Sequence, residues 1–570
     1  MTILRKYCFT IFLALLAESC AGPAQQSDII LEGRGIVARN GMVVSAKREA
    51  SGIGVEILIK GGNAVDAAVA TGFALAVCYP EAGNIGGGGF MVIRLADGNC
   101  DVLDYREKAP GSATRNMYLD ASGNVIDGSS TDTHLASGVP GSVDGLIEAH
   151  RKYGKLPFSQ IIQPAIDLAE NGYILTAEQA NSLNLARKDF IDRNLKVPAL
   201  AGRSPWKEGD VLRQRELAAT LRLIRDKGRD GFYAGKVASL IINEMSRGHG
   251  IISQKDLDEY RSVWRKPLEG EYHGFTIITA PPPSGGGITL LQILNMIGPR
   301  DLKSPEFHSA GNIHLIIEAE RRAFADRSFF AGDPDFTTIP VNKMLDPKYL
   351  SERMSDFRSD RASLSVDISH GSPEKPVPEE TTHYSVVDSE GNAVSTTTTL
   401  NGTFGNCIVV EGAGFLLNNE MDDFSVKPGF PNMYGLTGGE ANSIAPGKRM
   451  LSSMTPSIVL KNGKIFMVVG SPGGSTIPTT VLQVILNVTD WGMNIQSAVD
   501  AGRFHHQWMP DVVYTENAAI DSVTVLKLVS MGHRFKTRGP IGSANSIMKL
   551  KDGSLQGGAD PRGNNIAAGY

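Results

Sequence analysis

Cysteine is scarce in this 570-residue chain, which contains five. Three of them, Cys78, Cys100 and Cys407, lie beyond the N-terminal segment and do not make a disulfide framework, although a Cys78–Cys100 bridge stays open. The metal-binding patterns CxxC and HExxH are also absent. His314 and Glu318 are four residues apart and share a helix face, which we interpret as a surface ion pair or a capped helix face. No metal site is therefore expected.

An excess of charge of one sign is lacking as well. The chain has 56 basic and 61 acidic side chains, for a net charge of −5. This balance excludes a strongly basic nucleic-acid-binding protein and gives no electrostatic reason to expect an anionic membrane surface as a partner. With 42% hydrophobic and 21% charged residues, the composition is that of a globular protein and excludes disordered and collagen-like classes.

Long apolar runs are missing, apart from a short one near the N-terminus. Arg5 and Lys6 precede the apolar residues 9–17, and small residues follow, which is the order of a secretory signal over residues 1–22. The run is shorter than the roughly 20 residues that cross a bilayer. Cys20 offers an alternative, a lipoprotein anchor, although Ala-Glu-Ser-Cys is an imperfect lipobox. We expect an exported protein that is secreted or periplasmic, with or without lipid on Cys20.

The mature chain changes character along its length. Residues 36–110 mix strands, helices and glycine turns in a layered α/β pattern, and residues 141–330 are mostly helical. No Gly-Lys-Ser/Thr follows the glycines at 86–89, so they predict a tight turn and not a phosphate loop. Residues 354–380 are polar and proline-containing, and their composition is typical of a mobile connector.

A β-hairpin follows that connector. A turn centred on Glu390 pairs positions whose numbers sum to 780, so Thr381 faces Thr399 with Cβ atoms about 5 Å apart. If the bond before Thr381 is cut, its new α-amino group, with a pKa of about 8, lies beside its own hydroxyl and can act as a general base. Thr399 is placed to orient that hydroxyl. From the residues alone, an ordinary threonine-rich hairpin remains the alternative.

Long motifs carry a resemblance that extends this interpretation. The chain resembles the γ-glutamyltranspeptidase family over essentially its whole mature length, through DYREKAP, GNIGGGGFMV, TTHYSVVDSEGNAVSTTTTLNGTFG, LLNNEMDDFS, KRMLSSMTPSIVL, GSPGGSTIPTTVLQ and RFHHQW. The resemblance implies an α/β fold, the four-layer αββα sandwich of N-terminal nucleophile hydrolases. It also implies self-cleavage between Glu380 and Thr381, which leaves a large chain (23–380) and a small chain (381–570) that stay associated as a heterodimer.

The resemblance also assigns roles to site residues. It implies that Thr381 is the nucleophile, Thr399 its hydroxyl partner, and the backbone N–H groups of Gly473 and Gly474 the oxyanion hole. The implied substrate contacts are Arg106, Ser452 and Ser453 to the α-carboxylate, Asn401, Glu420 and Asp423 to the α-ammonium, and a lid loop (428–439) that contains Tyr434. These residue types suit the roles, because an arginine fork matches a carboxylate and glycine N–H groups approach an oxyanion closely. Thr396 and Thr398 stand where the family more often has Val and Tyr, so altered packing is expected there.

The implied activity is that of a γ-glutamyltransferase and glutathione hydrolase. Thr381 would take the γ-glutamyl group from glutathione or another γ-glutamyl compound and pass it to water or to an amino acid or peptide acceptor. No cofactor is needed, because the protein supplies the base and the oxyanion donors. Two alternatives stay open: a cephalosporin acylase-like amidase acting on glutaryl side chains, and a periplasmic binding lipoprotein without catalysis.

Overall fold

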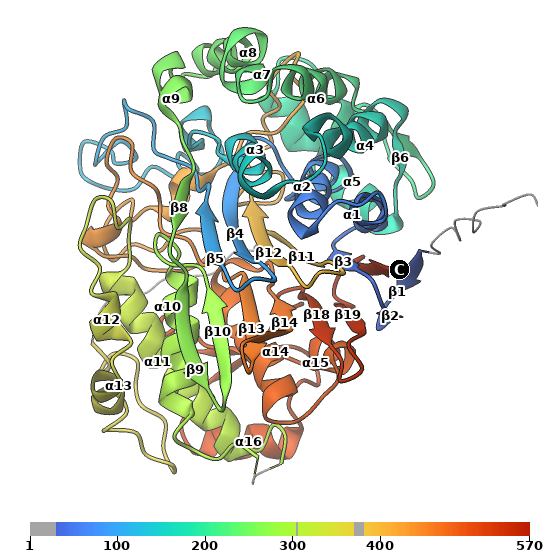
Figure 1. Cartoon of the computed structure of the whole chain (residues 1–570). Coiled ribbons are helices and arrows are strands. Elements are labelled where there is room, and N and C mark those ends of the chain that lie inside the picture. Colours follow the sequence, from blue (N-terminus) through green and yellow to red (C-terminus); the bar gives the residue numbers. More distant parts are fainter. Residues whose placement is uncertain (1–29, 304–305, 370–380) are drawn as a thin grey trace, which may run out of the picture.

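Two stacked antiparallel sheets form the centre of the molecule, and helices cover both outer faces (Figure 1). The computed structural model describes residues 30–303, 306–369 and 381–570. The predicted signal (1–22), Cys20 and Glu380 lie outside these residues. The order of layers is helix, sheet, sheet, helix, so the predicted αββα sandwich is confirmed.

Each sheet takes strands from both sides of residue 381. The eight-stranded sheet has the order β1 (Leu31–Gly33), β20 (Ile566–Gly569), β3 (Met42–Ser45), β11 (Thr382–Val387), β12 (Ala393–Thr399), β4 (Gly88–Arg94), β5 (Cys100–Asp104), β8 (Val263–Arg265). The seven-stranded sheet has the order β2 (Val37–Ala38), β19 (Leu555–Ala559), β18 (Asn545–Lys549), β14 (Lys464–Val469), β13 (Ser457–Lys461), β10 (Phe275–Thr279), β9 (Leu268–Tyr272). In the eight-stranded sheet, β20 lies between β1 and β3, so the segments before and after residue 381 are interleaved.

The helices divide between the two outer faces. On the side of the eight-stranded sheet lie α1 (Arg48–Ile59), α2 (Ala64–Cys78), α3 (Ser142–Tyr153), α4 (Phe158–Asn171), α5 (Ala177–Arg193), α6 (Arg215–Lys227), α7 (Asp230–Tyr233), α8 (Gly235–Arg247) and α9 (Gln254–Glu259). On the other side lie α10 (Gly285–Ile297), α11 (Ala310–Phe330), α12 (Val341–Met344), α13 (Pro347–Arg353), α14 (Ile477–Thr489), α15 (Ile495–Asp500) and α16 (Ser522–Ser530). A small sheet of β15 (Phe504–His505), β16 (Val513–Thr515) and β17 (Phe535–Thr537) completes the second side.

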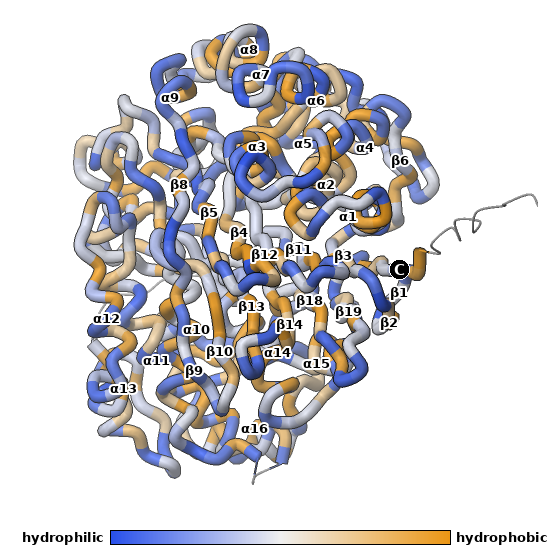
Figure 2. Tube along the Cα trace, viewed as in Figure 1, coloured by the Kyte–Doolittle hydropathy of each residue, from blue (hydrophilic) through white to orange (hydrophobic). Residues whose placement is uncertain are grey.

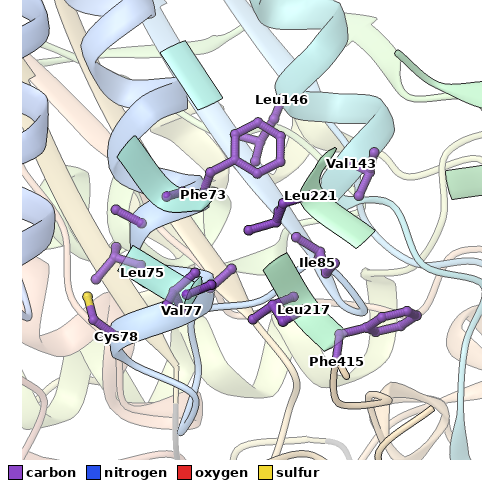
Figure 3. Close-up of a cluster of buried hydrophobic side chains, with 14 of the residues drawn as sticks. Phe73, Leu75, Val77, Cys78, Ile85, Val143, Leu146, Leu217, Leu221 and Phe415 are labelled. Atoms are coloured by element: carbon purple, nitrogen blue, oxygen red, sulfur yellow. The ribbon is translucent and has the colours of Figure 1, made fainter. Parts of the chain in front are cut away.

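Helix α2 supports the hairpin from the first helical layer. Its sequence is apolar all round, and all 15 of its residues are buried, as expected of a helix enclosed by protein. Asn63 caps its N-terminus in a reciprocal capping box with Asp66. Phe73 points toward Leu146 of α3 and Leu221 of α6 (Figure 3). The opposite face of α2 packs on β11 and β12 and fixes them in place.

Hydropathy follows the layers. Hydrophobic residues run along the inner strands and α2, whereas outward-facing segments such as α9 are hydrophilic (Figure 2). Along β11, Tyr384 and Val386 belong to the core under the first helical layer. Ser385 points the other way and donates to the Asn545 carbonyl in the second sheet, at 2.9 Å. Ser385 therefore lies between the two sheets.

The hairpin register is confirmed. Thr382 pairs with Thr398 and Val387 with Ala393, and each pair sums to 780. Thr381 directly precedes β11, and Thr399 ends β12, so the two threonines lie at the same end of the hairpin. Both are buried.

The glycine run at 86–89 does not form the predicted tight turn. Gly88 and Gly89 open β4, and each glycine lies against backbone: a Cβ on Gly87 would meet the Thr399 carbonyl oxygen at 2.0 Å, and one on Gly89 would meet that of Thr397 at 2.4 Å. The glycines therefore permit close approach of neighbouring chain segments beside the end of β12.

The prediction that residues 354–380 form a mobile connector is wrong for the first part of this segment. Within residues 354–369, Met354, Ser365 and Ile368 are buried against the second helical layer, and the Ser365 carbonyl accepts from Trp508 Nε1 at 2.9 Å. Residues 370–380 lie outside the described residues. Composition missed this packing because only a few apolar residues, such as Ile368, make it, together with backbone carbonyls.

The surface ion pair predicted for His314 and Glu318 is also wrong, because both residues are buried. Arg321 and Arg322 pair with the Glu318 carboxylate at 3.2 and 2.7 Å. His533 joins the group, with its Nε2 2.7 Å from His314 Nδ1. The charge of Glu318 is therefore balanced by protein cations. Cys78, Cys100 and Cys407 are free thiols.

Candidate active site

A small pocket lies where the hairpin ends. It is lined by Arg106, Thr381, Thr399, Asn401, Asp423, Tyr434, Ser452, Ser453, Met454, Gly474 and Ile477. Every predicted site residue within the described residues lines it except Glu420, which contacts Arg106, and Gly473, which adjoins Gly474. A larger hollow beside the start of α6 contains none of them. Residues more than 300 positions apart in the chain are thus gathered around Thr381.

The end of β12 is fixed by hydrogen bonds. Asn401 N donates to Thr399 Oγ1 at 2.8 Å, and Asn84 Nδ2 donates to the Thr399 carbonyl at 2.8 Å. Ser142 Oγ in turn donates to Asn84 Oδ1 at 2.6 Å. Asn84 was not among the predicted residues, although it stands in the GNIGGGG motif. It positions the strand that carries Thr399, and Thr398 adds a bond from its hydroxyl to the Gly88 carbonyl, at 2.8 Å.

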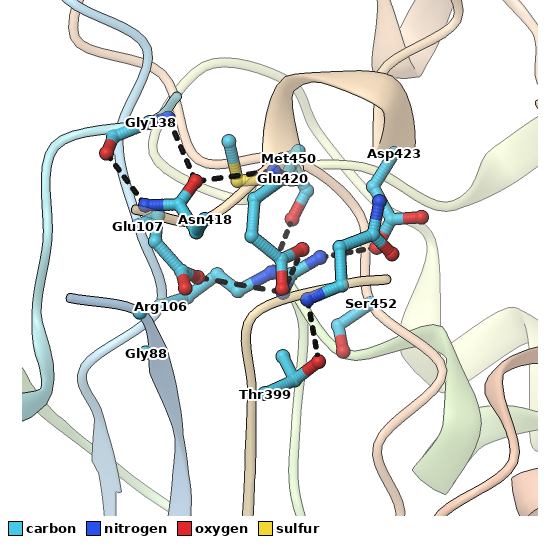
Figure 4. Close-up of polar contacts among 12 residues, drawn as sticks. Gly88, Arg106, Glu107, Gly138, Thr399, Asn418, Glu420, Asp423, Met450 and Ser452 are labelled. Carbon is cyan, nitrogen blue, oxygen red and sulfur yellow. Dashed lines mark hydrogen bonds and ion pairs between the residues drawn. The ribbon is translucent and has the colours of Figure 1, made fainter. Parts of the chain in front are cut away.

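A buried ion-pair cluster forms one wall of the pocket (Figure 4). The Arg106 guanidinium lies 2.5 Å from Glu420, 3.4 Å from Glu107, and in a very short contact with Asp423. Burial raises the pKa of the Glu420 and Asp423 carboxyls, and Arg106 opposes that rise. Burial likewise raises the pKa of Glu107 to about 7. The sequence analysis predicted Arg106, Glu420 and Asp423 as site residues but did not predict that they pair with one another.

This cluster places opposite charges side by side near Thr381. Arg106 lines the pocket and offers a fork of donors, which suits a carboxylate. Asp423 lines it too and offers carboxylate oxygens, which suit an ammonium group. A ligand that carries both charges on one carbon can therefore pair with both residues at once.

The loop 428–439 closes over the pocket. Tyr434 donates from its hydroxyl to the Asn401 carbonyl at 2.6 Å. Asn432 Nδ2 donates to Asp423 Oδ1 at 3.0 Å, and Met433 N donates to Asp422 Oδ2 at 2.8 Å. Tyr434 is 4% exposed. The loop is therefore tied to Asp423 of the pocket wall and to its neighbour Asp422, which is the arrangement expected of a lid.

Gly474 lines the same pocket and Gly473 directly precedes it, at the start of the turn that leads into α14. Gly473 and Gly474 have positive φ, +127° and +47°. A Cβ on Gly473 would lie 2.5 Å from Thr476 Oγ1, so a side chain does not fit there. Backbone N–H groups at a helix start carry partial positive charge and suit a developing oxyanion.

Ser452 and Ser453 are held by the loop that precedes α10. Gly285 N donates to the Ser452 carbonyl at 2.8 Å, and Ser284 Oγ donates to the Met454 carbonyl at 2.5 Å. Arg327 of α11 donates to Ser453 Oγ at 2.8 Å. Sequence reasoning passed over Arg327, because it lies in a charged helix, HLIIEAERRAFADR, with no local sign that the residue is buried.

Comparisons with known proteins match this chain to one family over most of its length. The family model Gamma-glutamyltranspeptidase matches residues 50–570. A glutathione hydrolase proenzyme of Pseudomonas sp. (strain A14) is 49% identical over 533 residues, which cover 93% of this chain and 92% of that protein. The glutathione hydrolase proenzyme of Escherichia coli (strain K12) is 44% identical over 581 residues and covers 100% and 99%.

Two solved structures are similar in fold. The crystal structure of cephalosporin acylase from Bacillus halodurans gives a TM-score of 0.82 at 27% identity and covers 98% of this chain and 99% of that one. The crystal structure of Helicobacter pylori gamma-glutamyltranspeptidase gives a TM-score of 0.56 at 45% identity, with 59% of this chain and 95% of that one covered.

Proposed function

Because this chain belongs to the γ-glutamyltranspeptidase family, we propose that its pocket carries out γ-glutamyl transfer and glutathione hydrolysis. One observation carries the proposal: Arg106 and Asp423 bring opposite charges to the pocket that Thr381 lines. The α-carbon of a γ-glutamyl group bears such a pair of charges. The relatives named glutathione hydrolase proenzyme are enzymes, so the alternative of a non-catalytic binding lipoprotein is set aside.

Thr381 is proposed to act after the chain has been cut before it. Its α-amine takes the proton of its own hydroxyl, and the oxygen attacks the γ-carbonyl carbon of the donor. The N–H groups of Gly473 and Gly474 receive the negative charge that develops on the carbonyl oxygen. The C–N bond breaks, the amine leaves with the proton, and an acyl-enzyme ester remains on Thr381. Water or the amine of an amino acid or peptide then takes the acyl group.

Processing and export complete the proposal. Cleavage between Glu380 and Thr381 would give chains 23–380 and 381–570, once residues 1–22 have been removed. The word proenzyme in the relatives' names supports such maturation. The Helicobacter pylori structure supports it too, because 95% of that chain matches only 59% of this one, as expected if that chain is one of two cleavage products. We propose an exported protein, periplasmic or secreted, with lipid on Cys20 as the alternative form of the N-terminus.

The donor test separates this activity from the acylase alternative. Glutaryl-p-nitroanilide differs from γ-glutamyl-p-nitroanilide only by lacking the α-ammonium group, so it would leave Asp423 and Glu420 without their substrate partner. An unpaired charge in a desolvated site costs about 2–5 kcal/mol. We expect kcat/KM for the γ-glutamyl donor to exceed that for the glutaryl donor by at least about thirtyfold. Equal or faster turnover of the glutaryl compound would favour the acylase.

Thr399 gives a prediction about catalysis. Thr399→Val keeps the shape of the side chain but removes the hydroxyl that is proposed to orient Thr381. We expect kcat to fall by about ten- to a hundredfold, the range for one lost orienting hydrogen bond, and Thr399→Ser to retain most of it. The measurement is kcat of the fully processed variants with γ-glutamyl-p-nitroanilide. If processed Thr399→Val has the kcat of wild type, Thr399 does not orient Thr381.

A further inference from the structure

A second arginine lies behind the serine side of the pocket. Arg327, on the last turn of α11, is 4% exposed and donates from its guanidinium to Ser453 Oγ at 2.8 Å. Its Nε has no hydrogen-bond partner among the residues that the structure describes. Within the same residues, no carboxylate lies within 4 Å of its guanidinium, whereas Arg106 contacts three. Arg327 is thus a buried cation whose charge is not balanced by a direct ion pair.

The surrounding fold makes room for this cation. Gly285 begins α10 beside it, and a Cβ there would lie 3.1 Å from Arg327 Nε. Burial lowers the pKa of Arg327 to about 10, Asp423 acts in the opposite direction, and Arg106 adds to the lowering. The guanidinium therefore stays charged at neutral pH, and it interacts electrostatically with Asp423 and Arg106.

Hydrogen-bond chemistry fixes what Arg327 does to Ser453. A guanidinium only donates, and a serine hydroxyl has one hydrogen and two lone pairs. Because Arg327 occupies a lone pair of Ser453 Oγ, the hydroxyl hydrogen is left to donate elsewhere, and Ser453 lines the pocket. An anionic group in the pocket is the partner that such a donor favours, and the positive charge behind it strengthens the bond.

We infer that Arg327 is a positioning residue for the donor's α-carboxylate: through Ser453 it aims a hydroxyl donor and an uncompensated positive charge at that group. The inference rests on the proposed γ-glutamyl donor. Arg106 supplies the paired donors for the carboxylate, but Glu107, Glu420 and Asp423 surround it and offset its positive charge. Arg327 supplies the charge that this cluster lacks.

The test compares two donors that differ only in the α-carboxylate. 4-Aminobutyryl-p-nitroanilide retains the ammonium group and the scissile amide of γ-glutamyl-p-nitroanilide but has no carboxylate. We expect Arg327→Met to lower kcat/KM for the γ-glutamyl donor by about ten- to a hundredfold, mainly through KM. Turnover of the 4-aminobutyryl donor should change less than about twofold, and Arg327→Lys should restore part of the loss. Equal losses on both donors, or no loss on either, would overturn the inference.

Two further variants keep the test decisive. Arg353→Met removes another arginine beside α11, one that pairs with Asp326 at 3.1 Å and does not line the pocket, so its effect should not depend on the donor. In a Ser453→Ala background, Arg327→Met should add less than about threefold, because the arginine acts through the serine; full additivity would contradict this. If Arg327→Met does not fold, Arg327→Lys and Ser453→Ala still give the donor comparison. If the wild-type protein did not prefer γ-glutamyl-p-nitroanilide over glutaryl-p-nitroanilide, the proposed function itself would be overturned.

Discussion

Thr381→Ala is expected to leave the protein as one uncut chain without measurable γ-glutamyl turnover. Cleavage before residue 381 needs a hydroxyl beside the scissile carbonyl, so that the acyl group can shift from nitrogen to oxygen before hydrolysis. Alanine removes that hydroxyl, and with it the nucleophile of the later reaction. Denaturing gel electrophoresis and N-terminal sequencing of the smaller band measure the outcome directly. In wild type that band should begin with Thr381-Thr382.

Thr382 provides the matched control for this variant. It is the next residue, it is equally buried, and its hydroxyl has no hydrogen-bond partner among the described residues. Thr382→Ala should therefore be processed and remain active, while Thr381→Ser, which keeps a hydroxyl, should also be cut. A Thr381→Ala protein that is still cleaved after Glu380 would refute the assignment of the nucleophile.

The second large effect is expected for Arg106. Arg106→Leu removes the proposed partner of the donor carboxylate, which costs about 2–5 kcal/mol, or roughly 30- to 5,000-fold in kcat/KM. It also leaves Glu107, Glu420 and Asp423 together without their cation, and breaking a buried ion pair destabilises a protein by about 3–5 kcal/mol. We therefore expect a lower Tm as well as a raised KM, measured by thermal unfolding and by γ-glutamyl-p-nitroanilide kinetics.

Two variants separate the two consequences of losing Arg106. Arg106→Lys keeps the charge that balances the carboxylates but loses the paired donors, so Tm should recover more than KM does. Asp423→Asn removes one acceptor for the ammonium group and leaves the Arg106–Glu420 pair in place, so KM should rise with a smaller change in Tm. A near-wild-type KM for processed Arg106→Leu would exclude the carboxylate role.

Sequence alone predicted the hairpin in detail. The alternation of HYSVVD and AVSTTTT and the turn between them leave little freedom in register, so the pairing of Thr382 with Thr398 followed from arithmetic. The αββα layers, by contrast, came from the family resemblance, because local patterns do not say which strands of two sheets become neighbours.

What the sequence missed involves buried charge. Arg327 and Glu318 lie in a helix whose sequence is rich in charged residues, yet both are buried. Arg327 donates to Ser453, far away in the chain, and Glu318 pairs with Arg322 on the same helix. Hydrophobic periodicity assigns such residues to the surface, because it carries no information about partners hundreds of positions distant. The pairing of Arg106 with Glu420 was missed for the same reason.

The interleaving of β20 between β1 and β3 has a thermodynamic consequence once the chain has been cut. Before the cut, unfolding and refolding are unimolecular, and the eight-stranded sheet closes on strands tethered to one another. After the cut, unfolding releases two separate polypeptides, each with strands that lack their neighbours. Reassembly is then a second-order process, and the midpoint of unfolding depends on protein concentration. We therefore expect folding to precede cleavage, and the lifetime of the cut protein to be set by its rate of unfolding.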